Sequence, residues 1–195
     1  MRQAQIRRQM TETDVRVALV LDGSGKASIA TGVGFLDHML TLLARHSLTN
    51  LKVAAKGDLA VDAHHTVEDV GLGFGQALAE ALGDKRGIAR YGSSTVPMDE
   101  ALVLAAVDLG GRPALAFGLD LRRRRVGDFD TELVQDFFQA VANAAKINVH
   151  LVQMAGRNTH HLIEAAFKAF ARALGQAVAP DPRVKGVPSS KGKLT

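Results

Sequence analysis

The feature that most constrains this chain is a motif that occurs twice, His-His-x-x-Glu, at residues 64–68 and again at residues 160–164. The copies are 160 − 64 = 96 residues apart in a chain of 195, and each opens a stretch whose apolar residues have helical spacing. Sliding the first half by 98 residues superposes further pairs: Phe35 on Leu133, Leu36 on Val134, His38 on Asp136, Met39 on Phe137 and Leu40 on Phe138. The chain is predicted to be a tandem duplication.

Periodicity and turn residues predict the same order of elements in each half. The first half should contain strands at residues 13–21 and 26–31 joined as a hairpin by the turn 22–25, a helix at 35–44, a strand at 51–55 and a helix at 65–82. The second should contain strands at 101–108 and 114–121, a helix at 131–145, a strand at 147–154 and a helix at 159–177. This β-β-α-β-α order predicts an α+β fold, with helices covering one face of a mostly antiparallel sheet in each half.

Three segments are expected: a first half at residues 1–92, a second half at 93–179, and a tail at 180–195. The tail is rich in Pro, Gly, Ser and Lys and has no periodicity, so we expect a loop that orders on a ligand or a neighbour.

Composition excludes several classes of protein. The absence of cysteine rules out disulfide scaffolds, Cys-type zinc fingers, iron–sulfur clusters and thiol catalysis, so a metal would have to be held by His and carboxylates. The net charge of 24 − 20 = +4 is mild for a nucleic-acid-binding protein. The longest apolar run, 101–107, is too short to span a membrane, and residues 1–10 are polar rather than signal-like. A soluble, cytoplasmic protein is expected, with neither a membrane nor a nucleic acid as partner.

The repeated motif has the spacing of a metal site. Glu68 follows His64 by four residues and His65 by three, so it shares a helix face with each. The two adjacent histidines point about 100° apart around the helix and cannot easily serve one ion, which suggests two metals. Eight candidate ligands result, enough for two ions with four each: His38, His64, His65, Glu68, Asp136, His160, His161 and Glu164. Whether one chain closes the site is open, because outward-facing halves would need ligands from neighbouring subunits.

Cationic residues suited to a phosphate form the second signal. Lys168 is the strongest of them, since it lies one helical turn after Glu164; the others are Arg90, Arg112 and the segment Ser189-Ser190-Lys191. The four arginines at 122–125 have no accompanying aromatic residues and are interpreted as a solvated loop. His46 and His150 lie outside the repeat and are interpreted as surface or supporting histidines.

Five segments together resemble one family, the imidazoleglycerol-phosphate dehydratases of histidine biosynthesis. They are Thr-Gly-Val-Gly-Phe-Leu-Asp-His-Met at 31–39, Asp-Ala-His-His-Thr-Val-Glu-Asp at 62–69, Gly-Gly-Arg-Pro at 110–113, residues 158–170 from Asn-Thr-His-His to Phe-Lys-Ala-Phe, and Pro-Ser-Ser-Lys-Gly at 188–192. The resemblance covers nearly the whole chain. It departs at Asp136, where several members carry a histidine, and at Leu42, where they carry a glutamine.

The resemblance implies two fused ferredoxin-like halves, two manganese ions per active site, and a large symmetric homo-oligomer, a 24-mer, with active sites between subunits. The implied reaction is a hydro-lyase step that removes water from imidazole glycerol phosphate and gives imidazole acetol phosphate. By similarity, proton transfer is assigned to Glu164, with Glu12 and Asp99 as further acid/base candidates. Substrate contacts are assigned to Glu12, His38, His46, Arg90, Arg112, Lys168, Ser189 and Lys191, so that the tail would close over the substrate.

Two other functions remain open on the residues alone. Two metals with nearby arginines also describe a dinuclear hydrolase acting on phosphoesters. The basic isoelectric point, the four consecutive arginines and the duplicated small α/β layout would also suit a non-enzymatic RNA-binding module.

Overall fold

The computed structural model describes residues 1–194, which form four helices and ten strands within that range. The elements of the first half are β1 (Gln3–Gln9), β2 (Thr13–Val20), β3 (Ala27–Ala30), α1 (Gly34–Ser47), β4 (Asn50–Gly57) and α2 (His64–Leu82). Those of the second half are β5 (Tyr91–Met98), β6 (Ala101–Asp108), β7 (Ala114–Gly118), β8 (Arg125–Val126), β9 (Phe129–Asp130), α3 (Leu133–Ala145), β10 (Asn148–Ala155) and α4 (Thr159–Val178).

The two halves repeat one sheet topology, as the duplication predicts. The first sheet has the order β1-β2-β4-β3 and the second the order β5-β6-β10-β7, and β8 and β9 form a separate short ribbon. In each four-stranded sheet the last pairing, β3 with β4 or β7 with β10, is parallel, and the others are antiparallel. The predicted α+β class with mostly antiparallel sheets is confirmed.

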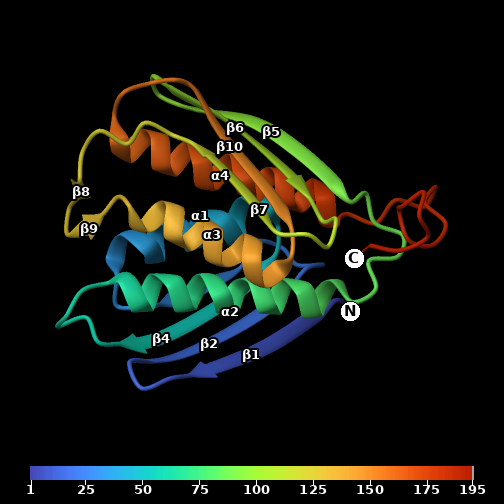
Figure 1. The fold of residues 1–195 in the computed structure, drawn as a ribbon, viewed down its shortest axis with the longest axis horizontal. Coiled ribbons are helices and arrows are strands. Elements are labelled where there is room, and N and C mark those ends of the chain that lie inside the picture. Colours follow the sequence, from blue (N-terminus) through green and yellow to red (C-terminus); the bar gives the residue numbers. More distant parts are fainter. Residues whose placement is uncertain (195) are drawn as a thin grey trace.

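The helices lie between the two sheets and form one core (Figure 1). α2 packs on β1 and β2, α4 packs on β5 and β6, and the helices meet across the middle as the pairs α2 with α3 and α1 with α4. A single cluster of buried apolar side chains runs through both halves and includes the fully buried Phe74, Phe137, Phe138, Phe167 and Phe170. Because each sheet buries only one face, its strands alternate between buried and more exposed residues, as in β6.

The predicted hairpin between residues 13–21 and 26–31 is wrong. β2 and β3 do not pair with each other, because β4 lies between them and pairs with both. The Asp-Gly-Ser-Gly segment crosses the end of β4 instead, where Asn50 Oδ1 accepts hydrogen bonds from the backbone N–H of Ser24 and of Lys26 at 2.9 and 3.1 Å. The turn residues between β2 and β3 therefore belong to a connection that crosses over β4, and not to a hairpin.

Each four-stranded sheet contains one more strand than the sequence predicted, β1 in the first half and β5 in the second, and the second half also contains the short ribbon of β8 and β9. β1 has the polar sequence Gln-Ala-Gln-Ile-Arg-Arg-Gln, which an edge strand can carry because little of it is buried. β5 contains Gly92-Ser93-Ser94, and a glycine inside a strand weakens the strand pattern of the sequence. A Cβ on Gly92 would lie 1.9 Å from the carbonyl oxygen of Ala173, so this glycine allows α4 to approach the strand closely.

The described part of the tail, residues 180–194, has no helix or extended strand, as predicted. It lies beside the C-terminal ends of α2 and α4, whereas the ribbon β8–β9 marks the end of the molecule where those helices begin (Figure 1). Within residues 1–194 no helix combines the length and the apolar character needed to cross a bilayer.

Candidate active site

The first copy of the motif opens α2 and meets a residue of the other half. Asp62 Oδ1 accepts a hydrogen bond from the backbone N–H of His64 at 2.8 Å, which anchors the exposed start of the helix. The His64 Nδ1 atom lies 3.6 Å from Asp136 Oδ2 on α3. Two of the predicted metal ligands are thus brought together from opposite halves of the duplication.

His65 faces a carboxylate that sequence analysis did not single out. Its Nδ1 atom lies 2.9 Å from Oδ2 of Asp58, which follows β4. The hydrogen bond to Asp58 raises the pKa of His65, and the negative charge of Glu12, in the turn between β1 and β2, adds to the effect. Glu68, the last member of the motif, is exposed one helical turn after His64.

The second copy opens α4 and gathers three predicted ligands. Asn158 caps the helix, because its Oδ1 accepts hydrogen bonds from the backbone N–H of His160 and of His161. The Nε2 atom of His160 lies 3.2 Å from Glu164 Oε2, and Nε2 of His38 on α1 lies 3.5 Å from the same oxygen. An imidazole from the first half therefore points at a carboxylate of the second half.

His161 lies between two carboxylates of the β5–β6 turn. Its Nδ1 is 2.7 Å from Oε2 of Glu100, and its Nε2 is 3.5 Å from Oδ2 of Asp99. The hydrogen bond to Glu100 raises the pKa of His161. That same bond, together with the backbone N–H groups of Asn158 and Arg157, lowers the pKa of Glu100 to about 2. Glu100 is therefore ionised at neutral pH and was also missed by sequence analysis.

Lys168 lies on α4 and His46 on α1, and these two helices pack against each other. The Lys168 Nζ atom is 2.6 Å from Glu164 Oε1, as the spacing of four residues predicted. Burial alone would raise the pKa of Glu164, but the hydrogen bond and charge of Lys168, with His160 and His38, give a net lowering. Burial and the charges of Lys168 and Arg172 lower the pKa of His46.

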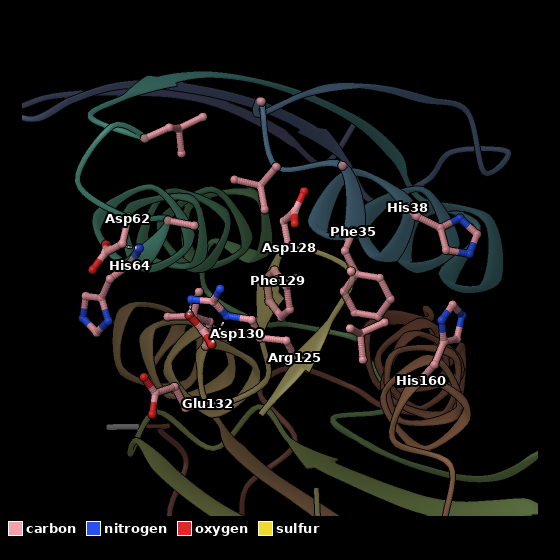
Figure 2. A pocket seen from close by; sticks show the side chains of 18 of the residues that line it. Phe35, His38, Asp62, His64, Arg125, Asp128, Phe129, Asp130, Glu132 and His160 are labelled. Carbon is pink, nitrogen blue, oxygen red and sulfur yellow. Dashed lines mark hydrogen bonds and ion pairs between the residues drawn. The ribbon is translucent and has the colours of Figure 1, made fainter. Parts of the chain in front are cut away.

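A hollow of about 650 Å³ separates the two groups of histidines. Figure 2 shows His64 and Asp62 on one side of it and His38 and His160 on the other, with Phe35 and Phe129 between them. The Phe35 ring contacts both the Phe129 ring and the His160 imidazole, with centroid distances of 5.1 and 5.3 Å. One chain therefore keeps its two groups of candidate ligands apart.

The remaining phosphate candidates lie at the opposite end of the helices. The backbone N–H of Arg90 bonds to Ala177 O, near the end of α4, whereas His160 is in the first turn. The 177 − 160 = 17 residues between them correspond to about 25 Å of helix. Arg112, Ser189 and Lys191 share this far end. Asn148 Nδ2 donates to the carbonyl of Arg112, and Asn148 pairs with Asp108, which bonds to Arg90. Arg90 also bonds to the tail at Pro188, next to Ser189.

Arg90 is already engaged within the chain. Its guanidinium donates to both carboxylate oxygens of Asp108, at 2.8 and 3.2 Å, and its Nη1 donates to the carbonyl of Pro188 at 2.9 Å. Arg90 therefore ties the tail, including Ser189, to the second sheet. Asp108 is a third carboxylate that sequence analysis did not single out.

The chemistry of the donor atoms suits a divalent ion, but one chain brings together only part of each set. Imidazole nitrogens and carboxylate oxygens converge in pairs at His64–Asp136, His160–Glu164 and His38–Glu164. Over the described residues 1–194, however, no three His, Asp or Glu side chains are placed so that they could hold one ion. The structure thus brings the candidate ligands together in pairs.

Asp58, Glu100 and Asp108 were missed for a common reason. None of the three belongs to the repeated motif. Glu100 and Asp108 are also distant in sequence from the residues that they contact, His161 and Arg90, whereas Asp58 is seven residues before His65. The one available signal was their position, since all three end a strand or lie in the turn beside one.

Comparison with known proteins gives one consistent result. The family model described as imidazoleglycerol-phosphate dehydratase matches residues 31–174. A relative named imidazoleglycerol-phosphate dehydratase from Symbiobacterium thermophilum is 60% identical over 193 residues, which is 99% of this chain and 93% of that protein. A protein of the same name from Paracoccus denitrificans is 57% identical over 195 residues, covering 100% of both chains.

Solved structures agree with the sequence matches. A crystal structure of imidazoleglycerol-phosphate dehydratase from Staphylococcus aureus superposes with a TM-score of 0.83 at 44% identity, covering 91% of this chain and 99% of that one. A structure of the Pyrococcus furiosus protein superposes with a TM-score of 0.84 at 35% identity, covering 97% and 100%. The chain has the duplicated fold, and its histidines pair with carboxylates of the opposite half, as His38 does with Glu164 and His64 with Asp136. The chain belongs to the imidazoleglycerol-phosphate dehydratase family.

Proposed function

We propose that this chain is a manganese-dependent dehydratase that removes water from imidazole glycerol phosphate and gives imidazole acetol phosphate in histidine biosynthesis. The observation that carries the proposal is the crossed pairing of the two motifs. Each His-His-x-x-Glu helix start meets a candidate ligand from the other half, Asp136 in one case and His38 in the other. The high identity to named dehydratases over the full chain supports this assignment of substrate and reaction.

Two Mn²⁺ ions per active site would be held by the eight predicted ligands. Nitrogen and carboxylate oxygen donors in an incomplete protein shell leave positions for a substrate. When bound, such ions supply Lewis acidity toward an imidazole ring. The ligands are His38, His64, His65, Glu68, Asp136, His160, His161 and Glu164.

Glu164 is the proposed group for proton transfer. It is buried, and Lys168 lowers its pKa by a hydrogen bond, so the carboxylate is ionised and ready to accept a proton from a substrate carbon. Glu12 and Asp99 are further acid/base candidates, and each lies in the turn between two strands, beside His65 and His161 respectively.

The complete site would lie between subunits of a large symmetric homo-oligomer. In one chain, about 25 Å of helix separates His160 from the end where Arg90 anchors the tail. A phosphate held by Arg90, Arg112, Ser189 and Lys191 could therefore reach the histidines only if those cations come from a neighbouring chain. His38, His46 and Lys168 would contact the substrate from the histidine side.

Product analysis tests the proposal. Protein loaded with Mn²⁺ should convert imidazole glycerol phosphate into a ketone that retains its phosphate, and protein treated with a chelator should not. Release of inorganic phosphate would favour a dinuclear phosphoester hydrolase. Salt-sensitive RNA binding without turnover would favour a nucleic-acid-binding module, and either result would overturn the dehydratase assignment.

A further inference from the structure

We propose that Asp58 and Glu100 are positioning residues that hold His65 and His161 in the tautomer whose Nε2 can bind a metal ion. A carboxylate has no proton to donate, so a neutral imidazole beside it must carry its hydrogen on the facing nitrogen. Both carboxylates face Nδ1, at 2.9 Å for His65 and 2.7 Å for His161. Each hydrogen bond therefore favours a neutral ring whose hydrogen is on Nδ1 and whose Nε2 keeps its lone pair. Asp99 Oδ2 lies 3.5 Å from Nε2 of His161 but makes no hydrogen bond with it. The inference rests on the metal assignment made above.

One oxygen of Asp58 faces the protein interior. Its Oδ1 atom is buried and has no hydrogen-bond partner among the described residues, and the same is true of Thr66 Oγ1, on the residue after His65. Gly57 packs directly against this threonine, because a Cβ there would lie 2.0 Å from Thr66 Oγ1. The carboxylate thus has one oxygen buried and the other 2.9 Å from Nδ1 of His65.

Glu100 is fixed by the backbone that starts α4. Its Oε1 atom accepts hydrogen bonds from the N–H of Asn158 at 2.8 Å and of Arg157 at 3.2 Å. Asn158 is itself the cap of the helix that carries His161. One carboxylate therefore links the β5–β6 turn, the helix start and the imidazole, so the ring orientation is set before any ion binds.

The two carboxylates come from positions that are not equivalent in the duplication. Asp58 lies between β4 and α2, and the residue 96 positions later is Met154, which cannot accept in the same way. Glu100 lies instead in the turn between β5 and β6. The two halves thus provide the same contact to the second histidine of the motif from different elements, which indicates that this histidine requires it.

Stability alone does not account for these contacts. His65 and Asp58 have exposed side-chain fractions of 44% and 24%, and His161 and Glu100 have fractions of 25% and 47%. Pairs with this exposure contribute little to folding. Carboxylates that accept the second N–H of a ligating histidine commonly change metal affinity by about 10–100-fold.

Manganese binding to the full-length protein tests the inference. The variants are Asp58→Ala, Asp58→Asn, Glu100→Ala and Glu100→Gln, with Asp84→Asn as the control, because Asp84 is exposed beyond the far end of α2. Mn²⁺ dissociation constants are measured by competition with a chelating dye, and thermal unfolding is measured in excess chelator. The alanine variants should bind Mn²⁺ about 10–100-fold more weakly, with unchanged melting temperatures.

The amide variants separate positioning from a purely structural role. Asn and Gln keep an oxygen that can accept the Nδ1–H bond, so their affinities should lie between those of the wild type and the alanine variants, and Asp84→Asn should match the wild type. Unchanged affinity in all four variants, with wild-type protein binding Mn²⁺, would overturn the positioning role alone. Lower melting temperatures in chelator with unchanged affinity would also overturn it. Failure of the wild type to bind Mn²⁺ would overturn the metal assignment itself.

Discussion

The Nε2 atom of His38 lies 3.5 Å from Oε2 of Glu164, which joins the first helix of one half to the last helix of the other. The counterpart of this contact is His64 with Asp136, where α2 of the first half meets α3 of the second. Each copy of the motif therefore contacts a candidate ligand that comes from the other half of the chain. Neither half could present its full group of candidate ligands alone, although the two halves share one core.

Loss of a motif histidine should remove metal and activity together. We expect His65→Ala and His161→Ala to bind less Mn²⁺ per chain and to lose more than about 100-fold in kcat/KM, since changing only the partners of ligands already costs 10–100-fold. Arg124→Ala, in the exposed arginine segment, should change neither. Elemental analysis and steady-state kinetics provide the measurement, and full Mn²⁺ content in both histidine variants would contradict the ligand assignment.

Lys168→Ala should retain metal and lose substrate affinity. Removing a charge-assisted hydrogen bond to a phosphate costs about 1.5–3 kcal/mol, so KM should rise by about 10–100-fold. Because Lys168 also bonds to Glu164 at 2.6 Å, kcat is expected to fall as well. The exposed Lys56→Ala is the matched control. A normal KM in the Lys168 variant would rule out its phosphate contact.

Two inactive variants should restore activity when they assemble together. His161→Ala removes a histidine at the start of α4, and Arg112→Ala removes a cation at the opposite end of the folded molecule. If each site takes its histidines from one chain and its arginine from another, mixed assemblies should recover up to about one quarter of wild-type activity. Co-refolding the two variants, with each variant refolded alone as control, measures this. No recovery in assembled mixtures would place the whole site within one chain.

The shared core should depend on the close approach of α2 and α3. A Cβ on Gly75 would lie 2.7 Å from Ala144 Cβ and 2.8 Å from the carbonyl of Val141. We expect Gly75→Ala to reduce the free energy of unfolding by about 1–2 kcal/mol, because overpacking exceeds the gain in helix propensity. Gly34→Ala, at a position with nothing within 4 Å, is the control. Denaturant unfolding in chelator should rank Gly75→Ala clearly below it.

The Arg2–Asp22 pair should make stability depend on acid. The Arg2 side chain hydrogen-bonds Asp22 and lowers its pKa, and its Nη1 also donates to Val178 O at the end of α4. A lowered carboxyl pKa stabilises the fold above the unfolded-state value of about 4, and this contribution is lost as the pH falls through the folded-state value.

Asp22→Asn should therefore matter more at neutral pH than in acid. With Asp22 43% exposed, the loss at pH 7 should be a few tenths of a kcal/mol and at most about 1 kcal/mol, or at most about 2–4 °C in melting temperature, and it should be smaller at pH 3. Calorimetry of the two proteins at both pH values measures the difference. A gap that is as large at pH 3 as at pH 7 would show that the charge of Asp22 is not the cause.

Local patterns in the sequence are enough to predict the duplication, the α+β class, and most of the helices and central strands. These follow from local patterns: the repeated motif at residues 64–68 and 160–164, and apolar spacing along each buried helix face. The sequence also placed Lys168 beside Glu164, because a spacing of four residues on one helix fixes neighbours without reference to the rest of the fold.

The way in which the strands, helices and site residues meet became visible in the folded chain alone. Sequence patterns did not show that β4 lies between β2 and β3, that polar β1 and Gly-containing β5 are strands, or that Asp58 and Glu100 contact the second histidines. Strand order and contacts between distant residues depend on how sheets and helices pack. The spacing of apolar residues along the sequence contains no information about that packing. For the same reason the sequence could not show that His38 faces Glu164 while Arg90 lies at the other end of α4.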